Sequence, residues 1–265
     1  MLGFPPESYD DLLRWSDDMI RGTTSTDAAA LMQAHAAAEE FAEFQLRIVA
    51  DRRAEPTDDL ISALVHAEVD GERLDDKSLI EEGRLLLIGG DETTRHVLTG
   101  GMHAFLQHPA EQRQLAKAYE DGEDDTIALA VEELLRWVTP IKNMNRTTTR
   151  DVEVGGETIP AGSQVLLMFE AANRDASVFH EPDRFDVDRD PNEHLAFGFG
   201  AHFCLGNALA RIELRVMFER VFARLPDLEL ASTDTLPRRN SNFITGFESM
   251  PVRFTSTGPM VPMRS

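Results

Sequence analysis

Cysteine is almost absent from this chain, because Cys204 is the only one among 265 residues. A single cysteine excludes an internal disulfide. It also excludes zinc and iron–sulfur sites that need several cysteines from the same chain. If Cys204 has a chemical role, it performs that role as the only thiol of the chain.

Long apolar runs are absent as well. No stretch of about 18 uninterrupted apolar residues occurs, so we expect no membrane span. Residues 1–5 lack the basic flank and the apolar stretch of a secretory signal. These two absences predict a cytoplasmic protein.

Basic residues are few relative to acidic ones: 26 Lys and Arg stand against 47 Asp and Glu, a formal net charge of -21. An acidic surface repels phosphate backbones and anionic headgroups, so no nucleic-acid partner is expected. The 42% hydrophobic and 28% charged residues are typical of a packed globular protein. With no repeat or low-complexity linker in the sequence, we expect a single domain over residues 1–255 and a flexible tail over residues 256–265.

Apolar spacing and capping residues predict helices through most of the chain. The expected helices cover residues 9–20, 27–53, a segment opened by a cap at 57–59, 78–106, 126–138, and a last helix that starts near Cys204. Gly89 and Gly90 interrupt the fourth of these, at a cost of about 1 kcal/mol each relative to alanine. Short strands are expected at 152–154, 158–159, 165–169 and 243–254, with an irregular segment at 174–203. The predicted fold class is mainly α with small β-sheets.

The only cysteine lies in residues 197–206, among glycines and aromatic residues and directly before the last helix. Backbone N–H groups and the dipole at a helix start favour a thiolate there. Glycine lets the backbone approach a flat ligand closely. The alternative is that a lone cysteine is an inert buried residue, as most are.

This segment resembles the haem-binding loop of the cytochrome P450 family, Phe-x-x-Gly-x-x-x-Cys-x-Gly, at every fixed position: Phe197, Gly200, Cys204 and Gly206. The resemblance implies heme b (iron protoporphyrin IX) as cofactor, with Cys204 as the iron ligand. It also implies the cytochrome P450 fold and a haem-thiolate monooxygenase. The haem-contacting residues that it implies are Phe197, Gly198, Gly206 and, on the opposite face, Gly90.

Glu133 and Arg136 are three residues apart and thus share one helical face. By itself such a pair is most often solvated at the surface. The family resemblance instead implies a buried pair joined by an arginine from the irregular segment, and Arg184 is the predicted third member. The implied role of this triad is structural.

Residues 89–94 resemble the family's Gly-x-Glu/Asp-Thr segment on the distal face of the haem. The resemblance implies that Gly90 leaves room for dioxygen and that Glu92 and Thr93 are the catalytic acid–alcohol pair that organises proton delivery. The alternative is a helix kink at the glycine pair with Glu92 solvated.

Further residues follow from position in the family. Arg146 and His202 are the expected cationic partners of the haem propionates, with Arg150 as an alternative to Arg146. Arg211 and Arg215, one turn apart behind Cys204, predict a basic patch for an acidic ferredoxin. Their alternative role is ion pairing with Glu213 or Glu219. The expected substrate-pocket residues are Leu86, Gly89, Ile141, Met144, Phe243 and Ile244.

The resemblance covers residues 1–255 but corresponds only to the later part of a full cytochrome P450, so we expect a fold lacking the N-terminal helices. Residues 88–96, 194–207 and 242–251 look most like actinobacterial steroid C26/C27-monooxygenases of cholesterol catabolism. That likeness implies hydroxylation of the terminal methyl of a sterol side chain, such as that of cholest-4-en-3-one. Oxygen and electrons from a ferredoxin and its reductase would be consumed. The alternatives are an enzyme acting on a terpenoid or fatty acid, and a non-catalytic remnant that retains no haem.

Overall fold

The computed structural model describes residues 1–255, with the exception of the Val69 side chain. The chain divides into two compact units, Met1–Glu92 and Thr93–Ser265. The prediction of a single domain stays a prediction. The predicted tail, residues 256–265, lies outside the described residues.

The first unit is a set of helices around one apolar core. It contains η1 (Pro6–Ser8), α1 (Tyr9–Thr24), α2 (Ala28–Ala54), α3 (Leu60–His66), the hairpin of β1 (Glu68–Val69) and β2 (Glu72–Arg73), and the first part of α4 (Asp76–Gln107). Aromatic rings join α1 to α2, with the Trp15 and Phe41 centroids 6.1 Å apart. The predicted helix over 27–53 is confirmed, and Asp27 caps it by accepting a hydrogen bond from Ala29 N.

The Asp59 carboxylate caps α3 and ties it to the end of α2. It accepts hydrogen bonds from Ser62 N at 2.7 Å and from Arg52 Nε at 2.6 Å. Thr57 Oγ1 donates a third at 2.5 Å. Burial opposes ionisation of Asp59, but these hydrogen bonds outweigh it and lower the pKa of the carboxyl to about 2.

We expect the Asp59→Asn variant to unfold more easily at neutral pH by about 1 kcal/mol, because the cap and the ion pair to Arg52 are both weakened. The pKa of Asp59 is lower in the folded state than its ordinary 3.8, so this contribution is fully present above pH 3.8 and is lost as the pH falls toward about 2. Urea unfolding of both proteins across that range checks it. If the difference in unfolding free energy between the two proteins stayed constant with pH, the lowered pKa of Asp59 would be contradicted.

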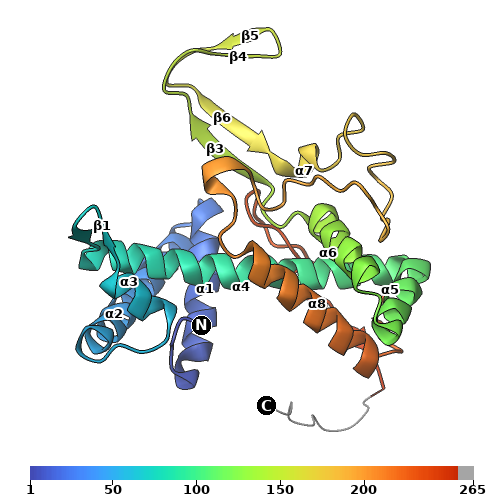
Figure 1. The fold of residues 1–265 in the computed structure, drawn as a ribbon, viewed down its shortest axis with the longest axis horizontal. Helices are drawn as coiled ribbons and strands as arrows, with labels where there is room; N and C mark the ends of the chain where they lie inside the picture. Colours follow the sequence, from blue (N-terminus) through green and yellow to red (C-terminus); the bar gives the residue numbers. More distant parts are fainter. Residues whose placement is uncertain (256–265) are drawn as a thin grey trace. The chain divides into compact units, whose positions relative to one another are not determined.

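The second unit combines helices with small antiparallel sheets. Besides the rest of α4, its helices are α5 (Pro109–Asp121), α6 (Asp124–Val138), α7 (Phe169–Ala172), η2 (Gly200–His202) and α8 (Asn207–Arg224). Its two-stranded sheets pair β3 (Asn143–Thr147) with β6 (Gln164–Met168), β4 (Val152–Val154) with β5 (Glu157–Ile159), and β7 (Glu229–Leu230) with β8 (Val252–Arg253). In Figure 1 the β3–β6 and β4–β5 pairs project away from α5, α6 and α8.

The core of the second unit is built around the Phe105 ring. Phe185, Phe218 and Phe222 meet it edge-on, with centroids 5.3, 5.5 and 5.5 Å away. Edge-to-face contacts of this kind contribute beyond simple burial of apolar area. They join α4, α8 and the irregular segment after α7 into one packed body.

Two sequence expectations need adjustment, and a third is confirmed. α5 was not among the predicted helices, since only Leu115 and Ala118 of it are buried. The helix expected over 78–106 is confirmed, because α4 runs without a break through Gly89 and Gly90. The strand expected over 243–254 is limited to β8 and to isolated bridges at Ile244 and Phe247. Between them Gly246 lies against the His96 ring, where a Cβ would be 1.9 Å from the ring. The fold class, mainly α with small sheets, is confirmed.

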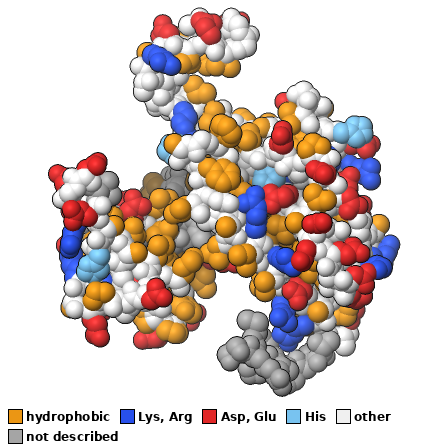
Figure 2. Space-filling view, viewed as in Figure 1, with side chains coloured by type: hydrophobic (Ala, Val, Ile, Leu, Met, Phe, Trp, Pro, Cys, Tyr) orange, Lys and Arg blue, Asp and Glu red, His pale blue; other side chains and the backbone are white. Residues whose placement is uncertain are grey.

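The surface of the second unit has one edge that is rich in acidic side chains. Figure 2 shows Asp and Glu side chains gathered along its right-hand edge, over α5 and α6. Among residues 1–255, no helix combines the length and the apolar character that crossing a bilayer requires.

Candidate functional site

The only cysteine is presented by a tight loop that closes on itself. Cys204 N donates a hydrogen bond to Phe197 O at 2.9 Å, and Gly198 N donates to Leu195 O at 2.9 Å. Gly198 and Gly200 have φ angles of 70° and 69°. That left-handed region favours glycine, so the loop path depends on these two residues.

Cys204 lies three residues before the start of α8. Asn207, the first residue of that helix, donates from Nδ2 to Cys204 O at 2.7 Å. The Cys204 side chain is half-buried. Because the N-terminal end of α8 is close by, its unpaired N–H groups favour a negative charge on the sulfur.

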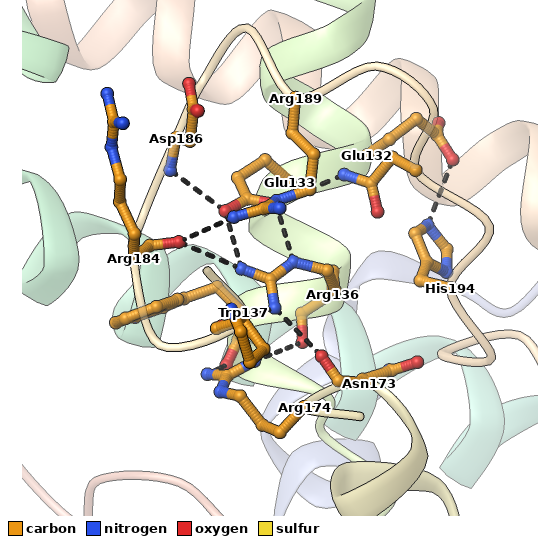
Figure 3. Close-up of polar contacts among 12 residues, drawn as sticks. Glu132, Glu133, Arg136, Trp137, Asn173, Arg174, Arg184, Asp186, Arg189 and His194 are labelled. Carbon is orange, nitrogen blue, oxygen red and sulfur yellow. Dashed lines mark hydrogen bonds and ion pairs between the residues drawn. The ribbon is translucent and has the colours of Figure 1, made fainter. Parts of the chain in front are cut away.

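Glu133 and Arg136 form a fully buried, bidentate ion pair on α6 (Figure 3). Arg136 Nε donates to Glu133 Oε2 at 2.7 Å and Arg136 Nη2 donates to Oε1 at 2.8 Å. Arg136 Nη1 donates to the backbone carbonyls of Asn173 and Pro182, both at 2.8 Å. The pair therefore fastens the irregular segment after α7 to α6.

The third member of this cluster is Arg189, and the assignment of Arg184 is wrong. Arg189 Nε donates to Glu133 Oε2 at 3.1 Å with its side chain 7% exposed. The Arg184 side chain is 59% exposed and pairs with Glu181. Arg184 contributes only its backbone carbonyl, which accepts hydrogen bonds from Arg136 and Arg189.

Side chains along the irregular segment alternate between buried and exposed, which explains why Arg189 and not Arg184 is buried. Phe185 and Val187 are each 1% exposed, so every second side chain points inward. Arg189 continues that inward series, whereas Arg184 falls on the outward one. The apolar alternation at 185 and 187 was the sequence signal that would have selected Arg189.

We expect Arg189→Ala to destabilise the protein by about 3 kcal/mol, because part of the Glu133 charge loses its partner in a buried site. The matched variant Arg184→Ala should change the free energy of unfolding by less than about 0.5 kcal/mol, as exposed ion pairs usually do. Denaturant unfolding of both variants measures the two values. Equal losses would contradict the assignment of Arg189.

Glu132, beside Glu133 on α6, belongs to a second polar cluster that the sequence did not indicate. It accepts hydrogen bonds from Arg211 Nε at 2.6 Å and from His194 Nε2 at 3.0 Å. Burial opposes its ionisation, but Arg211 and His194 lower the pKa of Glu132 to about 2. Arg211 thus pairs with Glu132 and Arg215 pairs with Asp124. Neither pair is with Glu213 or Glu219, the partners considered from the sequence.

Four expected pocket residues lie in the second unit, and three of them are close together. Ile141 and Ile244 form a backbone bridge, and Lys142 N donates to Phe243 O at 2.8 Å. Met144 lies on β3, opposite Leu167 of β6. The remaining two, Leu86 and Gly89, lie on α4 in the first unit.

The other predicted site residues occupy α4 and two exposed positions. Gly90, Glu92 and Thr93 lie on α4, where Glu92 is fully buried, so the alternative of a solvated Glu92 at a kink does not hold. Arg146 and His202 are both exposed, and among residues 1–255 neither forms an ion pair.

Comparison with known proteins identifies the family. The cytochrome P450 family model matches residues 7–251. The chain belongs to the cytochrome P450 family. The predicted family membership is thereby confirmed, and the matched region includes the Cys204 loop and the Glu133–Arg136 pair.

Comparison with individual relatives shows what share of their length this chain covers. The steroid C26-monooxygenase of Mycolicibacterium smegmatis is 50% identical over 262 residues, which are 98% of this chain and 64% of that protein. The methyl-branched lipid omega-hydroxylase of Mycobacterium bovis is 40% identical over 260 residues, 96% of this chain and 58% of that protein. The chain therefore spans less than two thirds of the length of these relatives.

Solved structures show the same fold. The Mycobacterium marinum cytochrome P450 CYP268A2, solved in complex with pseudoionone, aligns with a TM-score of 0.88 at 34% identity. The alignment covers 96% of this chain and 61% of that one. The predicted cytochrome P450 fold is confirmed for this part of the family's length.

The residues present fit the haem that the family implies. Cys204 supplies one thiol, which is the donor of a thiolate-ligated haem iron. A Cβ added at Gly200 or Gly206 would meet nothing within 4 Å, so the backbone of the cysteine loop is open to a flat group at these positions. Phe199, in the loop that presents the cysteine, is 84% exposed and offers apolar surface.

Proposed function

We propose that this chain is the haem-thiolate part of a bacterial cytochrome P450 monooxygenase that hydroxylates the terminal methyl of a sterol side chain. The observation that carries the proposal is the closed loop that presents the only cysteine before α8. The 50% identity to steroid C26-monooxygenases supports the sterol substrate.

Bound heme b would supply the activation of dioxygen and the electron transfer. Cys204 would hold the iron through its thiolate, which would donate electron density to the metal. Phe197, Gly198 and Gly206 would line the proximal side of the cofactor. Arg146 and His202 would bind its propionates, since both side chains are exposed and form no ion pair among the described residues.

On α4, Glu92 and Thr93 would organise the protons that the reaction consumes, and Gly90 would leave space for dioxygen. Glu92 is fully buried, which suits an acid that exchanges protons inside a closed site. Leu86, Gly89, Ile141, Met144, Phe243 and Ile244 would bind the apolar substrate. All but the glycine are apolar side chains, as a site for a sterol requires.

The electrons would come from a ferredoxin and its reductase. Arg211 and Arg215 are both engaged in ion pairs, so they contribute less free positive charge than their sequence positions alone indicate. A ferredoxin contact behind Cys204 would therefore use apolar surface, such as Leu205, as well as charge.

Two spectral measurements test this function. Purified protein supplemented with haem should give a thiolate-type absorption when reduced and exposed to carbon monoxide. Cholest-4-en-3-one should shift the ferric Soret band, since a sterol bound beside the haem would change the surroundings of the iron. The absence of any Soret band after haem supplementation would favour the alternative of a non-catalytic remnant.

The alternative substrate class is a terpenoid or a fatty acid. The 40% identity to a methyl-branched lipid omega-hydroxylase supports it. Both substrate classes would use the same Cys204 loop and the same residues of α4. Spectral titration with a branched fatty acid beside the sterol separates them, because the tighter ligand identifies the class.

Replacing Thr93 with alanine should leave haem content unchanged and divert electrons to peroxide, because the hydroxyl organises protons and does not hold the cofactor. We expect substrate hydroxylation to fall by about 100-fold, in line with the usual contribution of a positioned proton-transfer group. Peroxide and product are measured together against NADH consumed in the reconstituted enzyme. Loss of haem instead of uncoupling would contradict this role.

A further inference from the structure

Two adjacent carboxylates on α6, Glu132 and Glu133, bind different segments of the second unit. Glu133 binds the irregular segment through Arg136 and Arg189. Glu132 faces the Cys204 loop through His194 and Arg211 (Figure 3 shows the His194 contact). The first carboxylate has a structural role that the family resemblance explains. The second carboxylate has no role in the function proposed above.

A continuous series of hydrogen bonds connects Glu132 to the backbone of the cysteine. Arg211 donates from Nε and Nη2 to the two oxygens of Glu132, at 2.6 and 2.8 Å. Arg211 Nη1 donates to Asn207 Oδ1 at 2.8 Å, and Asn207 Nδ2 donates to Cys204 O at 2.7 Å. A bidentate pair fixes the guanidinium plane, so its third nitrogen is aimed at Asn207.

The same guanidinium also touches the other end of the loop. The Arg211 guanidinium carbon lies 4.6 Å from the centroid of the Phe197 ring, a distance typical of a cation–π contact. Phe197 O in turn accepts the hydrogen bond from Cys204 N. Arg211 thus contacts one residue on each side of the cysteine, Phe197 before it and Asn207 after it.

His194 secures the start of the loop in the same way. Its Nδ1 accepts from Ala196 N at 3.2 Å, which leaves Nε2 as the protonated nitrogen that donates to Glu132. The His194 side chain is 4% exposed, so this orientation is held inside the protein. Glu132 therefore anchors the loop both before and after the cysteine.

We propose that Glu132 is a positioning residue that holds the Cys204 loop through Arg211, Asn207 and His194 and that sets, with Arg211, the charge beside the thiolate. This inference rests on the proposed function, because it takes Cys204 as the ligand of the haem iron. Groups around a metal ligand of this kind orient the ligand and tune the metal.

The positioning role is tested in the haem-free protein, because Cys204 is the only thiol and any thiol reagent reports on it alone. Glu132→Gln keeps the size of the side chain and removes its charge. We expect Cys204 to be labelled about tenfold faster in this variant, as the loss of one charge-assisted hydrogen bond implies. Asn207→Ala, which breaks only the last link, should also accelerate labelling.

Asp125→Asn is the matched control, since Asp125 is an exposed acid on the same helix and the variant carries the same change of charge. Its labelling rate should equal that of the unmodified protein. Thermal unfolding is recorded for each variant, so that labelling rates are compared only between proteins with similar melting temperatures. Equal labelling rates in all four proteins would overturn the inference.

The electrostatic role is tested by the reduction potential of the haem-bound protein. Glu132→Gln leaves the Arg211 charge uncompensated, so the potential should rise, while Arg211→Gln removes that charge and should lower it. A general loosening of the loop would shift both potentials in the same direction, and that result would overturn the assignment. If the unmodified protein formed no thiolate-type carbon monoxide complex, that result would contradict the proposed function. The labelling rates would still test the positioning role of Glu132, because they are measured without haem.

Discussion

Replacing Glu133 with glutamine is expected to reduce the free energy of unfolding by about 3–5 kcal/mol, because it leaves two buried guanidinium groups without their counter-charge. Glu133 accepts five hydrogen bonds, from Arg136 Nε and Nη2, Arg189 Nε, Asn192 Nδ2 and Asp186 N. Glutamine has one oxygen in place of two and turns an amide toward the arginines. Several of these donors therefore lose their acceptor at once.

Denaturant unfolding followed by circular dichroism measures this loss. Glu193→Gln is the matched control, since Glu193 is exposed and the chemical change is the same. Its effect should stay within about 0.5 kcal/mol, as for most surface substitutions. If Glu133→Gln were as stable as Glu193→Gln, the cluster would not be what fastens the irregular segment to α6.

Replacing Cys204 with serine is expected to abolish the thiolate-type absorption of the reduced carbon monoxide complex. No second cysteine exists in the chain to take over as ligand. A serine hydroxyl is far less acidic than a thiol and donates much less electron density to iron, so bound haem would give a different spectrum.

The spectrum is recorded on this chain after haem supplementation, alongside total haem content and thermal unfolding. The Cys204 side chain donates no side-chain hydrogen bond within residues 1–255, so the fold itself should tolerate serine. An unchanged spectrum in a folded, haem-containing variant would rule out Cys204 as the ligand.

The sequence by itself determined the features that depend on neighbouring residues. Gly198 and Gly200 permit the positive φ angles of the loop, and Phe197 and Cys204 are close enough in sequence to close it with one hydrogen bond. The helix over 27–53 follows from a cap and an uninterrupted helical stretch, both of which are local properties. The cysteine loop, the family and the main helices were therefore predicted from the residues.

Only the tertiary structure decided which distant side chains meet. Arg184 and Arg189 are five residues apart and have the same side-chain chemistry. Arg189 points toward α6 because it follows the buried residues Phe185 and Val187 in the same alternation, whereas Arg184 does not. Glu132 and Arg211 are 79 positions apart, so no local pattern relates them. Ion pairs between elements form where packing of apolar faces brings the elements together, and the sequence alone does not specify that geometry.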